Sequence, residues 1–264
     1  MNLLEARIVL RDRKILDVFD LALRFLVRNA GPFAKVSLAV VAPGILLSAW
    51  AAHELGWFWG WCAASYMGLL AQAPFTELAS RLVFEPEVHV KQVLWSSLKQ
   101  LPRMVFVRLG QLALVLAAAL FFFVPALLVA GFFFFIAEVM LLEKASFGAA
   151  TTRLQRLSAG AWGDALVGLL LLLVLHVGCT ILGDVAGRAI IEELLSFKAP
   201  EPAFQEGGSV LALAGFWCIL PFVAITRFLL YLNVRTRAEG WDVQTRFAAI
   251  AARAELERLE REAV

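Results

Sequence analysis

The chain has 264 residues, of which 61% are hydrophobic and 17% are charged, and its formal net charge is +2. A soluble domain is nearer one-half apolar and one-quarter charged, so this composition excludes an ordinary soluble protein. The apolar residues are concentrated in runs, which is typical of membrane spans rather than of one large core.

The first 35 residues carry seven Lys and Arg side chains and no apolar run of signal-peptide length, so we expect no cleavable signal peptide. Residues 14–30 place charged and apolar side chains on opposite faces of a helix, with Asp20 and Arg24 in the favourable i,i+4 order. We predict an amphipathic helix there, which either lies in the headgroup plane or packs under the bundle.

Six apolar segments follow and are predicted to be transmembrane helices. The stretch 109–142 holds one charge, Glu138, and would be about 51 Å long as a single helix. The hydrocarbon layer is only about 30 Å thick, so this stretch is predicted to be a hairpin that turns at Val124-Pro125-Ala126. The predicted spans are 36–52, 55–76, 104–123, 126–142, 165–183 and 210–232.

The segments between the spans are predicted to be partly helical. Residues 87–101 form a second amphipathic helix, which Pro102 ends, and residues 146–160 continue the fourth span into the cytoplasm. An acidic outer loop covers 184–208. Residues 1–242 are thus one transmembrane domain of an all-α polytopic bundle, and residues 243–264 form a cytoplasmic helical tail.

The orientation follows from the basic residues. The alternate segments 1–35, 77–108, 143–164 and 227–264 hold 22 of the 24 Lys and Arg residues. The positive-inside rule places these segments in the cytoplasm. We therefore expect a multi-pass protein of the bacterial inner membrane with both termini cytoplasmic and the lipid bilayer as its constant partner.

A stripe of small residues runs along the second predicted span at four-residue spacing: Gly56, Gly60, Ala64 and Gly68. Small side chains allow helix backbones to approach closely in a membrane. The stripe predicts close packing, either within the chain or with a second copy in a homo-oligomer.

Ionisable groups inside a bilayer are costly and are therefore candidates for function. Glu77, Arg108, Glu138 and Arg227 fall at similar depth near the cytoplasmic ends of their spans, and His176 lies in the middle of the fifth span. This candidate polar network either pins the helices together or forms part of a substrate or proton path.

No catalytic constellation is evident. The sequence contains no nucleophile elbow, HExxH motif, P-loop or phosphate-binding glycine loop, and its three histidines are scattered. We expect no catalytic residue, no metal, no cofactor, no nucleic-acid partner and no enzymatic activity.

Three regions carry a family resemblance. The first holds LRDRKILD at 10–17 and RNAGP at 28–32, the second holds VP at 124–125 and EKASFGAATTR at 143–153, and the third is YLNVRTRAEGWD at 231–242. Together they resemble the bacterial family described as glycerophosphoryl diester phosphodiesterase membrane-domain-like proteins. Asn233 and Ala126 depart from the usual Asp and Gly of that family.

The resemblance implies a six-helix membrane module with an accessory or scaffold role, because the enzymatic activity in the family name belongs to a separate soluble domain. It implies no catalytic residues. The third region also suggests a cytoplasmic lock, in which side chains after the sixth span pair with Asp17 and Asp20 or with Arg153 and Arg156. The residues assigned to this lock are Asn233, Arg235, Arg237, Glu239 and Asp242.

The first expectation for function is therefore a non-enzymatic scaffold or accessory subunit that binds a membrane or cytoplasmic protein through residues 243–264. The alternative is a transporter or channel subunit for a lipid-like or small solute, which the intramembrane charges favour. A polar cavity that reaches the middle of the bundle would favour the alternative.

Overall fold

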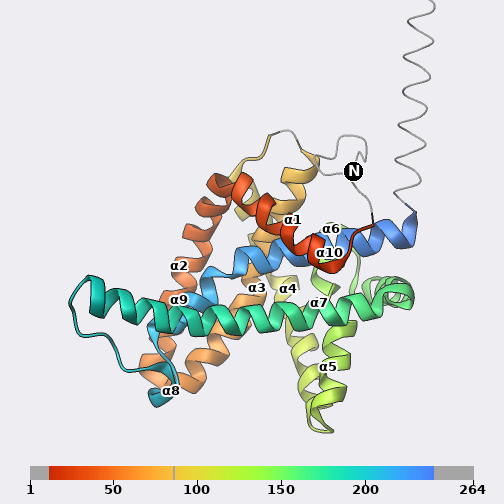
Figure 1. The fold of residues 1–264 in the computed structure, drawn as a ribbon. Coiled ribbons are helices and arrows are strands. Elements are labelled where there is room, and N and C mark those ends of the chain that lie inside the picture. The colour runs from red at the N-terminus through yellow and green to blue at the C-terminus, as the bar shows by residue number, and fades with distance from the viewer. Residues whose placement is uncertain (1–11, 86, 241–264) are drawn as a thin grey trace, which may run out of the picture.

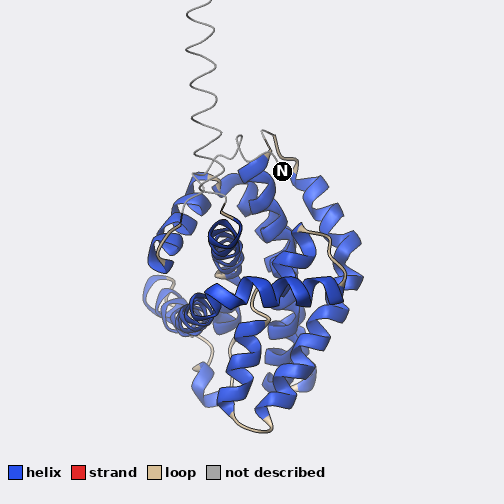
Figure 2. Cartoon of the chain, turned by 90° about the vertical axis from the view of Figure 1, so that its right-hand side faces the viewer, coloured by secondary structure: helices blue, strands red, loops and turns tan. Residues whose placement is uncertain are grey.

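The structure is a computed structural model and describes residues 12–85 and 87–240 (Figure 1). Over these residues the regular elements are helices, with no strand, which confirms the predicted all-α class (Figure 2). In chain order they are α1 Ile15–Arg28, α2 Ala30–Leu55, α3 Trp57–Phe84, α4 Val90–Ala119, α5 Phe123–Phe132, α6 Ile136–Leu142, α7 Phe147–Ala189, the π-helix η2 Ile190–Leu194, α8 Ala203–Glu206, α9 Val210–Cys218 and α10 Leu220–Glu239.

Within the part of the chain that the structure describes, five helical stretches are long and apolar enough to cross a membrane, which supports the predicted membrane location. They are Ala30–Leu55, Val90–Ala119, Phe123–Leu142, Gly160–Leu194 and Val210–Glu239. The predicted span 55–76 lies in α3, which is not one of the five. α3 has 28 residues, but tryptophans, glycines and Gln72 dilute its apolar character.

α3 and α10 form the centre of the molecule. α3 packs against α2, α4 and α10, and α10 also contacts α1 and α7 (Figure 1). Every residue of α10 from Val223 to Val234 is buried, so this helix is enclosed by its neighbours. A helix surrounded by protein does not need an apolar face toward lipid, which explains how α3 and α10 carry polar side chains.

The small-residue stripe of α3 packs within the chain. A Cβ atom on Gly60 would lie 2.6 Å from the Cβ atom of Ala52 in α2, and one on Gly68 would lie 3.1 Å from the ring of Phe216 in α9. Ala64 between them is fully buried. The stripe therefore brings α2 and α9 close to α3, as small residues do in membrane bundles.

α1 packs under the bundle, which was one of its two predicted positions. It lies against α10, with Val18, Ala22 and Phe25 buried and the ring centroids of Phe19 and Phe222 6.2 Å apart. Its outer side still exposes large apolar side chains, including Leu16 and Val27. α1 thus covers the buried part of α10 and keeps one apolar face outward.

Several predicted boundaries were wrong near prolines. The hairpin turns at 120–122 rather than at 124–126, because Pro125 fits the first turn of α5, where its missing N–H has no helical partner to lose. Pro102 does not end an amphipathic segment: α4 runs through it, so the predicted 87–101 helix and 104–123 span are one helix.

The fourth and sixth predicted spans are each broken in two. Residues 133–135 separate α5 from α6, and Ile219 separates α9 from α10, next to Pro221, which cannot donate a helical hydrogen bond. Residues 146–160 do not continue the fourth span. From Phe147 they belong to α7, joined to the fifth span across a kink at Ala161.

The predicted outer loop is also shorter than expected. Helix continues through Ala189 and then as η2 to Leu194, so the irregular connection begins only after that residue. A short helix, α8, interrupts the connection before α9 begins. The fifth predicted span, 165–183, is therefore only the middle part of a helix that runs well past it.

Candidate binding cavity and ion-pair network

A cavity of about 600 Å³ lies between α3, α4, α5, α7, α9 and α10. This volume falls within the range of roughly 300–1,000 Å³ that is typical of small-molecule sites. Its wall is mainly apolar, and its polar lining side chains are Ser65, Gln72, Arg108, Gln111, His176, Thr180 and Arg227.

The lining residues recur at helical spacing on three helices. On α3 they run from Trp61 to Gln72, and on α7 from Leu169 to Ile181. At 1.5 Å per residue these stretches extend for about 16–18 Å along the helix axes. The cavity is therefore elongated. We call the end at Gln72 and Arg227 its inner end, and the end at Trp61 and Ile181 its outer end.

Arg227 of α10 forms the floor of the inner end. Its Nη2 atom lies 3.0 Å from Oε2 of Glu138 in α6, and its guanidinium also donates to Gln72 Oε1 and to the carbonyl oxygen of Phe134. The guanidinium stacks on the Phe134 ring, 5.0 Å from its centroid. Arg227 thus joins α10 to α3 and to the break between α5 and α6.

Arg108 of α4 stands beside this pair. Its Nη1 atom donates to Gln111 Oε1 at 2.6 Å, and Gln111 Nε2 reaches the Phe133 carbonyl oxygen at 3.5 Å. Arg108 and Arg227 line the same cavity, and Arg227 pairs with Glu138, so the three side chains gather at one end of the cavity. The structure therefore brings together three of the five residues of the predicted polar network.

The break at 133–135 is what makes this floor. Residues between α5 and α6 expose the carbonyl oxygens of Phe133 and Phe134, which accept from Gln111 and Arg227. Irregular backbone at membrane depth occurs where it is buried in protein or lines a cavity, because every polar group must find a partner there. The arginine and the helix break thus stabilise each other.

The floor carries an excess of positive charge. Arg108, Glu138 and Arg227 are 1%, 1% and 5% exposed, and they comprise two cations and one anion. The Nε atoms of both arginines are buried without a hydrogen-bond acceptor in the described part of the chain. Each unmet buried donor costs about 1–3 kcal/mol, so an anion near these arginines would be stabilised.

The other two residues of the predicted network lie apart from the floor. Glu77 pairs with Arg81 at 2.8 Å and accepts from Ser96 and Ser97, which ties α3 to the start of α4. His176 lines the cavity wall toward the outer end, with its ring centroid 4.3 Å from that of Phe216. Glu77 is therefore a helix-pairing residue, while His176 faces the same cavity as the arginines.

A second cavity, of about 270 Å³, adjoins the outer end. It shares Trp61, Thr180 and Ile181 with the first and extends under α8. Buried Asp184 holds this covering segment, since it accepts from Ser209 Oγ and, at 3.2 Å, from the backbone N–H of Ala203. The two cavities together lead from the floor toward the 203–208 segment.

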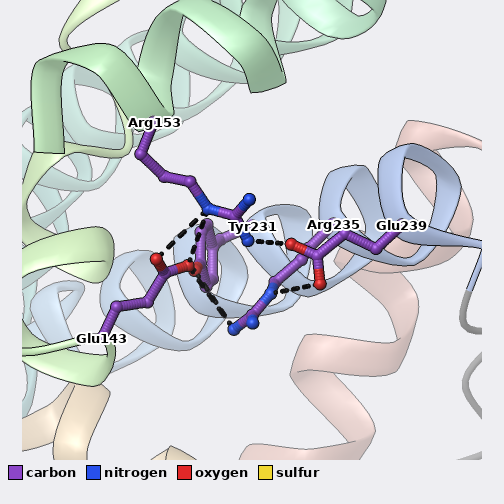
Figure 3. A network of polar contacts seen from close by, with 5 residues as sticks. All are labelled: Glu143, Arg153, Tyr231, Arg235 and Glu239. Carbon is purple, nitrogen blue, oxygen red and sulfur yellow. Dashed lines mark hydrogen bonds and ion pairs between the residues drawn. The ribbon is translucent and has the colours of Figure 1, made fainter. Parts of the chain in front are cut away.

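The predicted cytoplasmic lock forms a network around the end of α10 (Figure 3). Arg153 at the start of α7 pairs with Glu143 at 3.2 Å and with Glu239, while Arg235 pairs with the same two carboxylates at 3.5 and 3.0 Å. The Tyr231 hydroxyl donates to Glu143. Two cations and two anions therefore balance one another and join α10 to both sides of the 143–146 turn.

The remaining lock residues contact the start of the described chain. The Asn233 side chain accepts from the N–H of Arg13 at 2.8 Å and donates to its carbonyl oxygen at 3.0 Å. Arg237 pairs with Asp12 and Asp164, each at 2.7 Å. Of the predicted partners, Arg153 pairs with a lock residue as expected, whereas Asp20 pairs with Arg24. Asp242 lies outside the described residues.

Sequence reasoning missed the neutral polar residues of the cavity. Gln72 and Gln111 were not singled out, although an amide in the middle of an apolar run is as unusual as a charge and would have been a usable signal. Asp184 was assigned to a plain outer loop, because the extension of α7 beyond it was not foreseen. Over the described residues, no cluster of three His, Cys, Asp or Glu side chains could hold a metal ion.

Comparison of the chain with protein-family models, with curated proteins and with solved structures returned no match. The resemblance at 10–32, 124–153 and 231–242 therefore stays a prediction, and function has to be argued from the site itself.

Proposed function

We propose that this protein binds an amphiphilic, lipid-like molecule within the membrane and acts as a carrier or transporter subunit for it. The observation that carries the proposal is the cavity of about 600 Å³, with its mainly apolar wall and its polar floor of Arg108, Gln72 and Arg227. An apolar wall suits a hydrocarbon chain, and convergent polar groups at one end suit a headgroup.

The setting that we propose is a bacterial inner membrane with both termini in the cytoplasm. The distribution of Lys and Arg supports this orientation. In Figure 1 the tips of the α2–α3 and α4–α5 hairpins lie at the lower side with α8, and the α3–α4 connection and the end of α10 lie at the upper side. In this view (Figure 1) α2, α3, α4 and α5 run between the two sides, which supports crossings by these four helices, whereas α7 runs across that direction.

In that orientation the polar floor lies nearer the cytoplasmic side, and the second cavity opens the way toward the outer segment at 203–208. A molecule would then move between the two sides along the lined face of α3. The break between α5 and α6 supports this proposal, because discontinuous helices commonly form the substrate sites of secondary transporters.

The test compares two substitutions on α7. Val177 lines the cavity, whereas Val174, one turn earlier on the same helix, does not line it and is 70% exposed. Val177→Trp is expected to fill part of the cavity and to reduce the amount of co-purified lipid in native mass spectrometry, and Val174→Trp is expected to leave it unchanged. Equal lipid occupancy in both variants and the native chain would contradict the proposal.

The scaffold function that the sequence first suggested stays a prediction. The ionised side chains that surround Tyr231 pair within the chain, which argues for an internal role of that surface. Residues 243–264, to which the partner was assigned, lie outside the described residues. A chain truncated after residue 242 that lost a stoichiometric protein partner in mild detergent would support the scaffold function.

A further inference from the structure

The charge balance of the cavity floor identifies the headgroup that would fit there. Arg227 is matched by Glu138, but the hydrogen bond of the Arg108 guanidinium goes to the neutral amide of Gln111. Arg108 has no carboxylate of the described residues within ion-pair distance, and Arg227, which lines the same cavity, carries a second positive charge. One positive charge is therefore left uncompensated in the described surroundings of the floor.

A charge in such surroundings has a strong long-range effect. Arg108 is 1% exposed and lies in a span, so water screens it poorly and its interaction with another charge extends further than at a surface. Both Arg108 and Arg227 line the cavity, and each keeps a buried Nε donor without an acceptor among the described residues. An anionic group at the inner end would meet both the excess charge and nearby donors.

The wall of the cavity then indicates the chemistry of the rest of the bound ligand. Beyond the arginines most of the lining side chains are apolar, as Leu169, Leu172, Leu220 and Val223 are, and can take a hydrocarbon chain. The polar side chains Ser65, His176 and Thr180 also lie along this wall. A small hydrophilic anion would leave this wall in contact with nothing apolar. An anion attached to a chain satisfies both ends of the cavity.

We propose that the bound molecule is an amphiphile with a single negative charge, such as an alkyl carboxylate or phosphodiester, whose anionic group lies at the inner end beside Arg108 and Arg227. This proposal rests on the proposed function and specifies its ligand. A doubly charged headgroup would overcompensate the floor, and a neutral one would leave the charge of Arg108 unmatched.

The test uses probes of equal chain length on the full chain in a neutral detergent. Dodecanoate supplies a chain and one charge, dodecanol supplies the chain alone, and acetate supplies the charge alone. Native mass spectrometry or isothermal titration measures the affinity of each. Dodecanoate is expected to bind at least about tenfold more tightly than dodecanol, as one hydrogen bond to a charged group provides, and acetate is expected not to bind measurably.

Three variants change the charge of the floor in known directions. Arg108→Gln removes the excess charge and is expected to weaken dodecanoate binding about tenfold or more while leaving dodecanol binding unchanged. Arg108→Lys keeps the charge and is expected to retain most of the preference. Glu138→Gln adds one positive charge to the balance and is expected to strengthen dodecanoate binding.

Arg103→Gln is the matched control, because Arg103 lies on the same helix and does not line the cavity. If dodecanol and dodecanoate bind equally, and both are displaced by Val177→Trp, the cavity binds amphiphiles but the inference about charge is wrong. If neither probe binds the native chain, the proposed function itself fails. Opposite effects of Arg108→Gln and Glu138→Gln on dodecanoate also separate a charge effect from a loss of folding.

Discussion

Two clusters of arginine and glutamate lie next to one another along α10, the first around Tyr231 and the second around Arg227, and they differ in their charge balance. The network around Tyr231 contains two arginines and two glutamates, which are 18–27% exposed. The cluster at the cavity floor contains two arginines that line the cavity and one glutamate that does not, and its ion pair, Arg227 with Glu138, is only 6% and 2% exposed. The first cluster satisfies itself, whereas the second leaves a charge beside an open cavity.

The same residue types have different roles in the two clusters, according to the balance of positive and negative charge and to the burial of the side chains. A balanced, partly exposed network joins helices at modest energetic gain, since solvent screens each pair in part. A buried, unbalanced cluster costs free energy unless something completes it. We therefore read the network as structural and the floor as a binding site.

The largest expected effect comes from breaking the buried pair of the floor. Arg227→Met would leave Glu138 buried without its cation and is expected to cost about 3–5 kcal/mol. For a chain of this size that corresponds to a fall in Tm of about 6–20 °C, measured by scanning fluorimetry in detergent. Arg227→Met combined with Glu138→Leu should recover much of the loss. Additive effects of the two changes would contradict a coupled buried pair.

The next effect concerns the neutral member of the network. Tyr231→Phe removes the hydroxyl that donates to Glu143 and is expected to cost about 1.5–3 kcal/mol, because the acceptor is a charged group. Tyr66→Phe is the control: its hydroxyl donates to the Val105 carbonyl oxygen at 3.2 Å, a neutral acceptor, and its loss should cost about 1 kcal/mol. A smaller effect at Tyr231 than at Tyr66 would count against a charged acceptor there.

A third effect separates the two clusters by their response to salt. Arg153→Met is expected to cost about 1 kcal/mol at low ionic strength and less in concentrated salt, because its pairs are partly exposed. The cost of Arg227→Met should not change with salt, since its pair is buried. The free energy of unfolding, measured at two salt concentrations, gives the salt dependence of both variants. Equal salt dependence in the two variants would contradict the difference in solvent screening between the two clusters.

The smallest effect is expected at the exposed edge of the lock. Arg237 is 40% exposed and its partners Asp12 and Asp164 are 56% and 31% exposed. Arg237→Met should cost about 0.2–1 kcal/mol, in the range of surface ion pairs. Arg24→Met, whose side chain is 77% exposed and pairs with Asp20, should lie at the low end of that range. A loss of stability as large as that of Arg227→Met would contradict a surface ion pair at Arg237.

Much of the fold could be predicted from particular residues. The apolar runs indicated long helices, and the apolar length of 109–142 required a hairpin. Two of the errors fell at Pro102 and Pro125, because a proline breaks a helix only where its missing N–H and its ring matter. In α4 the chain continues through the proline, and in α5 the first turn has no bond to lose.

The candidate site was predictable only as a set of unusual residues. Arg108, Glu138 and Arg227 stood out as charges in apolar runs, but Glu77 stood out equally and belongs elsewhere, with Arg81 and the serines of α4. Depth along a helix can be counted from the sequence, whereas the direction of each side chain depends on how the helices rotate and pack. Sequence alone could not separate the two sites.

The sequence by itself determined that the chain is helical, that it is suited to a membrane, and that its charges are unevenly distributed, because these properties depend on composition and spacing. The tertiary structure alone decided that α5 and α6 break at 133–135, that Gln72 and Gln111 meet the arginines, and that a cavity remains beside them. Those features arise from the packing of helices distant in sequence, which no local pattern encodes.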